Sequence, residues 1–304
     1  MSITKDIRDA FEQRDNAVPQ YIIINVVVFA VLIVIQAVLA LSGHNELSND
    51  PTFRGIMRQL ELSSSLSVLL RHPWTPFTYA FTHKDPFHIF FNMLNLYYFG
   101  RLIQEYLGSR RFISLYILGG LAGAALYLVT YNTLPVFRGA EGVGLIGASA
   151  SVVAIIVAAA TLLPDYTFML LLFGAVRIKY IALFVILVSS VKPIYEGNPG
   201  GGLAHLGGAL LGYIFIKQMK AGRDMGKPVI ATGQWLGHLF DRRPALKVTH
   251  RGTASAGSTK PAANPKSATA AEEEVNGILD KISRSGYESL SKEEKQKLFQ
   301  ASQQ

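Results

Sequence analysis

The sequence lacks cysteine and is poor in charged residues. Because none of its 304 residues is a cysteine, disulfides, thiolate catalysis and metal sites with cysteine ligands are excluded. Only 16% of the residues are charged, whereas a soluble domain usually carries about a quarter, and 50% are hydrophobic. The apolar residues also stand in runs close to the roughly 20 that a helix needs to cross a bilayer. The composition therefore predicts a polytopic membrane protein.

Six apolar runs predict six transmembrane helices, at 20–41, 86–107, 112–131, 146–163, 176–192 and 202–220. Residues 1–19 are polar and lack the short apolar core and cleavage site of a signal peptide, so the first run reads as an uncleaved span. The loop 42–85 has apolar residues spaced as in amphipathic helices that lie in the membrane interface. We therefore expect an all-α membrane protein, a six-helix bundle with an interfacial helical loop between spans one and two.

Basic residues are distributed unevenly among the connections. Arg101, Arg110 and Arg111 crowd the link between spans two and three, and further bases follow span six. By the positive-inside rule, both termini are expected in the cytoplasm. The apolar stretch 166–173 is too short to cross and is expected at the inner interface, before span five.

The region after span six divides by composition. A basic juxtamembrane segment at 221–247 precedes a linker at 248–270 that is rich in Ala, Ser, Thr, Gly and Pro. A small helical region is expected at 271–304, where Ser291 and Glu294 have the spacing of a capping box. The basic segment could also bind nucleic acid, but its place directly after the last span favours lipid binding. We expect anionic lipid headgroups as the partner of residues 217–251, and no nucleic acid.

Polar residues inside spans are costly, and each is a candidate functional residue. Spans two, four and six all run from outside to inside. His88 and Asn92 lie near the start of span two, Ser149 near the start of span four and His205 near the start of span six. These residues therefore share a depth in the outer leaflet. His88 and Asn92, four residues apart, also share one helix face.

Ser149 lies at the beginning of a predicted helix, in Gly147-Ala148-Ser149-Ala150. A helix N-terminus offers unpaired N–H donors and a positive dipole end, which suits an oxyanion. Gly208 and Gly212 follow His205, and Ala150 begins a stripe of small residues on span four; such stripes let helices approach closely. Close approach would permit a hydrogen bond between Ser149 and His205. Ser151 lies about 200° around the helix from Ser149, so both cannot face His205.

The order of these motifs resembles the rhomboid family of intramembrane serine proteases. The resemblance covers about residues 20–220 and rests on five segments: Trp74-Thr-Pro-Phe-Thr-Tyr79, His83, His88-Ile-Phe-Phe-Asn92, Gly147-Ala-Ser149 and Ala204-His205-Leu-Gly-Gly208-Ala-Leu-Leu-Gly212. The family usually has Gly and often has an aromatic residue where this chain has Ala150 and Val153.

The resemblance implies a serine endopeptidase of a bacterial inner membrane, with a Ser149–His205 dyad and no acidic third member. It also implies an oxyanion hole made by the Asn92 side chain, His88 and the Ser149 N–H. Substrates would be transmembrane helices of membrane proteins, and neither a metal nor an organic cofactor is expected. Two other readings stay open: Asn92 as a bond between helices, and a catalytically weak or inactive rhomboid-like protein that binds transmembrane clients. His83 is expected to be structural.

Overall fold

The computed structural model describes residues 16–42, 50–139, 142–170, 174–195, 199–240, 275–282 and 289–301. The chain divides into two compact units, Met1–Arg242 and Arg243–Gln304. Nearly all of the predicted N-terminal segment 1–19, the whole linker 248–270 and the basic residues beyond 240 lie outside the described residues.

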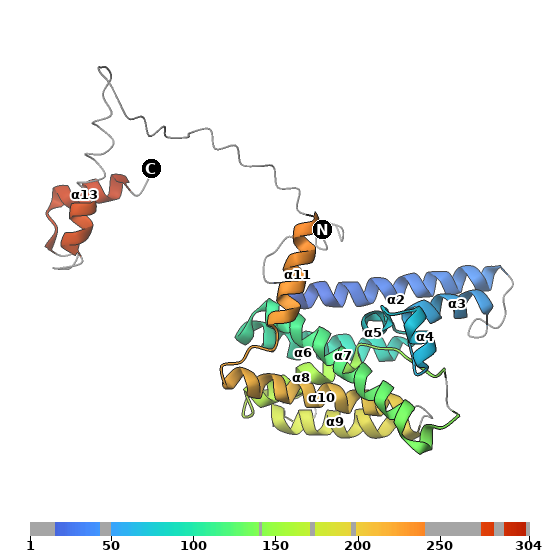
Figure 1. Ribbon diagram of the computed structural model, residues 1–304. Coiled ribbons are helices and arrows are strands. Elements are labelled where there is room, and N and C mark those ends of the chain that lie inside the picture. The colour runs from blue at the N-terminus through green and yellow to red at the C-terminus, as the bar shows by residue number, and fades with distance from the viewer. Residues whose placement is uncertain are drawn as a thin grey trace, which may run out of the picture. The chain divides into compact units, whose positions relative to one another are not determined.

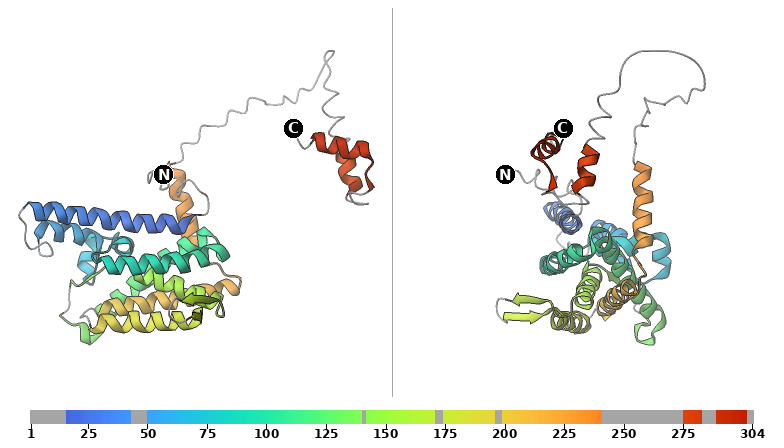
Figure 2. Two further views of the ribbon diagram at one scale, coloured as in Figure 1. Left: turned by 180° about the vertical axis from the view of Figure 1, so that it is seen from behind. Right: turned by 90° about the vertical axis from the view of Figure 1, so that its left-hand side faces the viewer.

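The first unit is a bundle of long helices (Figures 1 and 2). A helix lies at each of the six predicted positions, so the mostly helical prediction is confirmed. The helices are α2 (Ala17–Leu41), α6 (Pro86–Leu107), α7 (Ser109–Thr133), α8 (Ser149–Leu162), α9 (Ile178–Tyr195) and α10 (Pro199–Lys220). Among the described residues, α2, α7 and α10 are long and apolar enough to cross a membrane; α8 and the Ile178–Val191 part of α9 are apolar but shorter.

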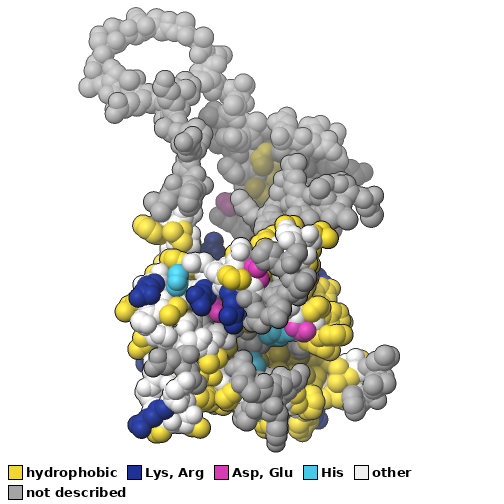
Figure 3. Space-filling view, turned by 90° about the vertical axis from the view of Figure 1, so that its right-hand side faces the viewer, with side chains coloured by type: hydrophobic (Ala, Val, Ile, Leu, Met, Phe, Trp, Pro, Cys, Tyr) yellow, Lys and Arg dark blue, Asp and Glu magenta, His cyan; other side chains and the backbone are white. Residues whose placement is uncertain are grey.

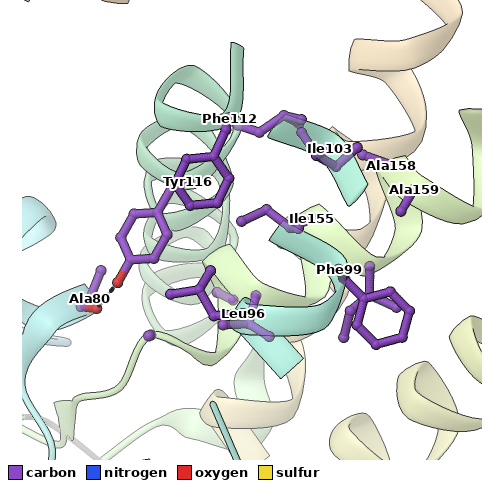
Figure 4. Packing of buried hydrophobic residues seen from close by; sticks show 14 of the residues in the cluster. Ala80, Leu96, Phe99, Ile103, Phe112, Tyr116, Ile155, Ala158 and Ala159 are labelled. Carbon is purple, nitrogen blue, oxygen red and sulfur yellow. Dashed lines mark hydrogen bonds between the residues drawn. The ribbon is translucent and has the colours of Figure 1, made fainter. Parts of the chain in front are cut away.

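α8 is the centre of the bundle. Every residue from Ala150 to Ala159 is buried, because α6, α7, α9 and α10 pack around it. Its sequence, made of small and β-branched residues, is apolar on all sides, as a fully surrounded helix requires. Figure 4 shows α6 and α7 packed against Ile155 of α8, through side chains that include Leu96, Ile103 and Phe112.

A buried hydrogen-bond chain joins α2 and the first loop to this core. The Asn25 amide of α2 donates to the Tyr116 hydroxyl of α7 at 3.1 Å. The Tyr116 hydroxyl donates in turn to the Ala80 carbonyl at 2.7 Å (Figure 4). Because buried polar groups are costly when unpaired, this chain fixes α2 and the loop against α7.

The first loop contains helices, as predicted. Its elements are α3 (Pro51–Leu60), β1 (Leu62–Ser63), α4 (Leu66–Arg71), α5 (Thr75–Thr78) and the 3-10 helix η1 (Tyr79–Phe81). The Asp50 carboxylate caps α3 by accepting from two backbone N–H groups, and Phe53 and Met57 of α3 are buried with Leu32 of α2. Strand β1 pairs antiparallel with β2 (Gly144–Leu145), so the loop braces the segment that leads into α8.

Further elements complete the unit. A 3-10 helix η2 (Pro135–Phe137) follows α7, and α11 (Lys227–Phe240) follows α10. The apolar stretch 166–173 contains strand β3 (Thr167–Leu170), which pairs antiparallel with β4 (Gly174–Arg177) just after the stretch. This hairpin projects sideways from the bundle (Figure 2).

The second unit contains a helix over 275–282 and α13 (Lys292–Ala301). Both bonds of the predicted capping box are present. The Glu294 N–H donates to the Ser291 hydroxyl at 3.3 Å, and the Ser291 N–H donates to the Glu294 carboxylate at 2.7 Å. Lys281 pairs with Glu294 at 2.9 Å, which joins the two helices.

Candidate active site

Ser149 is the first residue of α8, at the end of a turn that only glycine fits. Gly147 has φ +117°, a conformation that L side chains rarely adopt, and a Cβ there would lie 2.6 Å from the His88 ring. The Gly147 N–H donates to the Tyr79 carbonyl at 2.9 Å, and the Tyr79 hydroxyl donates to the Gly120 carbonyl at 2.6 Å. The turn is therefore fixed both to the first loop and to α7.

The structure brings Ser149 and His205 into direct contact. The Ser149 Oγ lies 2.7 Å from His205 Nε2. His205 Nδ1 lies 2.6 Å from the backbone carbonyl oxygen of Ser189 in α9. A carbonyl oxygen can only accept, so Nδ1 carries the proton and donates it. Nε2 is then the acceptor that faces the serine hydroxyl, which is the tautomer that a general base needs.

Ser151 faces away from this pair. It is fully buried, and its hydroxyl points towards Gly120 on α7, where an added Cβ would lie 2.8 Å from the Ser151 Oγ. The two serines therefore face different sides of α8, as predicted from their spacing. The Ser149 hydroxyl is the one beside His205.

Two glycines let α10 approach α8. A Cβ at Gly208 would overlap the carbonyl oxygen of Ala150, and a Cβ at Gly212 would overlap that of Ala154. Both contacts are with backbone, which cannot move aside as a side chain can. The contact at Gly208 lies within one turn of both Ser149 and His205, so it bears directly on the distance between them.

The methyl group of Ala150 points at α7 and not at α10. Its backbone faces α10, but its methyl points at α7, where a Cβ on Gly123 would lie only 2.6 Å from it. The methyl that replaces the family's usual glycine is therefore accommodated by Gly123. Val153 packs with Val157 and Ala209 in a small apolar cluster between α8 and α10.

Asn92 and His88 lie at the start of α6, which Asp85 caps by accepting from the His88 N–H at 2.7 Å. The Asn92 amide donates to the His88 carbonyl at 3.0 Å and lies 3.3 Å from His83 Nε2. His88 reaches the site through its ring, which covers Gly147 beside Ser149. Figure 3 looks onto the right-hand end of the bundle in Figure 1 and shows histidine side chains (cyan) at the surface.

His83 links two parts of the site that the sequence did not connect. Its Nε2 accepts from the Ala148 N–H at 3.2 Å and faces the Asn92 amide at 3.3 Å. Burial, with a smaller contribution from His88, lowers the pKa of His83 to about 3, so its ring is neutral and the single lone pair of Nε2 is shared between the Ala148 N–H and the Asn92 amide. A neutral histidine thereby holds Asn92 next to the residue before Ser149. In the sequence, the only indication of this role was that His83 is one of the five segments that resemble the rhomboid family.

The histidine rings near Ser149 have no acidic side chains grouped with them in the described residues that could complete a metal site. The rings of His83 and His88 lie 5.2 Å apart in an edge-on arrangement. Within the described residues, no group of three or more His, Asp or Glu side chains is placed to hold a metal ion.

A protein-family model covers the residues of this site. The family model of the Rhomboid domain matches residues 70–220, which include all of the groups above. The chain carries a rhomboid domain. Three of the described helices have the length and apolar composition of membrane spans, which supports a rhomboid-like intramembrane protein. Residues 266–304 match a second model, a family of unknown function (DUF6576).

Two plant proteins are similar to about half of this chain. RHOMBOID-like protein 12, mitochondrial, from Arabidopsis thaliana is 36% identical over 160 residues, which cover 49% of this chain and 47% of that protein. RHOMBOID-like protein 1 from the same plant is 29% identical over 161 residues, 51% of this chain and 38% of that protein. The chain thus spans about half the length, or less, of the curated relatives it matches.

Proposed function

We propose that the chain is an intramembrane serine endopeptidase that cleaves transmembrane helices of other proteins. The observation that carries the proposal is the 2.7 Å contact between the Ser149 hydroxyl and His205 Nε2, with Nδ1 anchored on the Ser189 carbonyl. A nucleophile, a base and a group that orients the base are the arrangement that covalent hydrolysis needs.

In this mechanism His205 Nε2 takes the proton of Ser149 as its oxygen attacks the scissile carbonyl. The imidazolium then gives that proton to the leaving amine, and an acyl-enzyme ester remains on Ser149. A water molecule, deprotonated by the same nitrogen, hydrolyses the ester and restores the serine. The Ser189 carbonyl replaces the usual carboxylate: it holds the ring, and its dipole stabilises the positive charge that forms on it.

The oxyanion would be stabilised where the first turn of α8 begins. Ser149 is the first residue of that helix, so its N–H belongs to the group without an intrahelical acceptor. The His88 ring beside Gly147 and the Asn92 amide held by His83 are the side-chain donors we assign to the same charge. Donors fixed in advance stabilise a transition state without reorganisation.

We also propose that all six long helices cross a bacterial inner membrane with both termini in the cytoplasm. The bases at the α6–α7 link and after α10 support this orientation. α8 has 14 residues and is about 21 Å long, shorter than the hydrocarbon core. Ser149 at its outer end would therefore lie below the membrane surface, where a substrate helix could reach it.

The proposal can be tested with the full chain in liposomes. Two model substrates would share one transmembrane helix, one with Gly and Ala in its outer turns and one with Leu there. We expect cleavage of the Gly/Ala helix at a bond within its outer half. If wild-type protein binds the helices but cuts neither, the chain is a client-binding rhomboid-like protein and the peptidase proposal is wrong.

Asn92 and Asn95 offer a matched pair for the oxyanion hole. Both amides donate to the carbonyl four residues earlier, but Asn92 is buried beside His83, whereas Asn95 is only partly buried. We expect Asn92→Ala to lower kcat about 10²-fold with little change in KM, because the lost donor acts on the transition state. Asn95→Ala should stay near wild type. Equal activity of the two variants would remove Asn92 from the site.

His83 predicts an acid-sensitive fold. Its pKa is about 3 when folded and about 6.5 when unfolded, so below pH 6.5 the unfolded chain binds more protons and the free energy of unfolding falls towards pH 3. At pH 4.5 this group alone should lower it by about 2–3 kcal/mol. His83→Gln keeps an acceptor but does not titrate. Its Tm should therefore fall less than that of wild type between pH 7 and pH 4.5; parallel curves would contradict the assignment.

A further inference from the structure

We propose that α11 and the β3–β4 hairpin form an inner platform that lies in the membrane interface and binds anionic lipid headgroups. The platform is at the end of the bundle opposite Ser149, since β3 follows the last turn of α8 and α11 follows the last turn of α10. The inference requires that the bundle spans a membrane, as proposed above, but it does not depend on peptidase activity.

The orientation of both elements fits the plane of a membrane. In the right-hand view of Figure 2 the long helices are seen nearly end-on, whereas α11 and the hairpin lie across the view. Figure 1 and the left-hand view of Figure 2 place both at the same end of the bundle. Elements perpendicular to the spans at one end lie in the interface plane, as amphipathic membrane-surface helices do.

Polar contacts with α7 fix the turn between α10 and α11, and thereby the direction of α11. Asp224, in the turn after α10, pairs with Arg111 at 3.1 Å and accepts from the Gly226 N–H at 2.9 Å. The Ser114 hydroxyl lies 3.3 Å from the Gly226 carbonyl, and Gly226 leaves no room for a side chain against Ser114. The turn is therefore held before α11 begins, and the helix leaves the bundle at a defined angle.

The platform exposes apolar side chains that nothing in the described part of the chain covers. On α11 every residue from 231 to 237 is exposed, with Trp235 at 61% and Leu236 at 45%, and on the hairpin Met169 is 80% exposed. Leu236 and Gln234 lie about 200° apart around the helix axis, so the two side chains face opposite sides of α11. Trp at the border of such a helix favours the depth of the headgroups.

The charged residues around the platform favour anionic lipid headgroups. Between residues 163 and 240 the described acidic residues are Asp165 and Asp224, and each is already paired: Asp165 with Lys179 at 2.8 Å and Asp224 with Arg111. The remaining bases in the last turn of α10 and after it therefore dominate the local electrostatic field, and each attracts a negative membrane surface. These bases are Lys217, Lys220, Arg223 and Lys227. An apolar face beside such bases fits an anionic bilayer better than a neutral one.

The absence of cysteine permits a direct test of depth. Nitroxide labels would be placed on the full chain at Leu236→Cys and, as the matched control on the opposite side, at Gln234→Cys, in vesicles containing phosphatidylglycerol. We expect the Leu236 label to collide readily with oxygen and poorly with a water-soluble nickel chelate, and the Gln234 label to show the reverse. Equal access of nickel to both labels would place α11 in water. A Leu236 label shielded from both reagents would mean that protein covers this face. Either result overturns the proposal.

The charge selectivity has its own measurement. The association of spin-labelled phosphatidylglycerol relative to phosphatidylcholine would be measured for wild type and for a variant with Lys220→Gln, Arg223→Gln and Lys227→Gln. We expect several-fold selectivity in wild type that falls towards one in the variant and at high salt. A control with Arg54→Gln, Arg58→Gln and Arg71→Gln, in α3 and α4, should keep the selectivity. If the first variant keeps it as well, these bases do not bind the headgroups.

Discussion

Replacing Ser149 or His205 with alanine should abolish hydrolysis, with a loss of at least about 10³-fold in kcat/KM. Ser149 supplies the attacking oxygen, and His205 supplies the nitrogen that removes its proton across 2.7 Å. Because the two act as one unit, the double variant should be no worse than either single variant. The measurement is initial-rate cleavage of a transmembrane substrate by full-length protein in liposomes.

Ser151→Ala is the matched control for Ser149→Ala. Both changes remove one hydroxyl from the first turn of the same helix, but the Ser151 hydroxyl is fully buried towards α7 and has no hydrogen-bond partner in the described structure. We expect nearly wild-type activity from it. Loss of activity in Ser151→Ala, with activity kept in Ser149→Ala, would exchange the two roles.

Gly208→Val should have the largest effect on folding. Any Cβ at this position meets the Ala150 backbone, so α10 and α8 must separate by the width of a side chain. Overpacking of a core usually costs about 1–3 kcal/mol, and we expect the upper end or more because the obstacle is backbone. The same displacement would carry His205 away from Ser149. We therefore expect a marked fall in Tm and a loss of cleavage, with Gly208→Ala intermediate.

Gly55→Ala provides the comparison for this effect. Gly55 lies within α3, and nothing lies within 4 Å of the place that a Cβ would take. Alanine should therefore be neutral there, or stabilising by up to about 1 kcal/mol, because it favours the helix. If Gly208→Val melted at the wild-type temperature, the close contact of α8 and α10 would not be what holds the dyad together.

The sequence predicts much of the fold because membrane helices are defined by composition. Apolar runs placed each of the six long helices within a few residues of where the structure has it. Two of these helices differ from a typical membrane span. α6 is long enough to cross a membrane but carries the polar residues His88, Asn92 and Arg101, and α8 has only 14 residues. The stretch 166–173 was too short for a span, but its composition did not show that it would contribute to a hairpin.

The sequence predicts the side chains of the site but not the backbone groups and packing contacts that position them. Residue types and a shared depth were enough to select Ser149 and His205. The group that orients His205 is the Ser189 carbonyl, and a backbone oxygen leaves no pattern in a sequence. The link from Asn92 through His83 to Ala148 depends on a loop that folds back on α6, which periodicity cannot describe. Likewise, only the packing shows that Gly123 accommodates the methyl of Ala150.

The most direct test of the central claim is where a fluorophosphonate attaches. This reagent phosphonylates a hydroxyl only when a neighbouring base activates it. The full chain would be labelled in liposomes, digested and analysed by mass spectrometry. We predict a single adduct on Ser149, absent in His205→Ala and unchanged in Ser151→Ala. No adduct on folded wild-type protein, or an adduct on another serine, would contradict the assignment of Ser149 and His205 as a catalytic dyad.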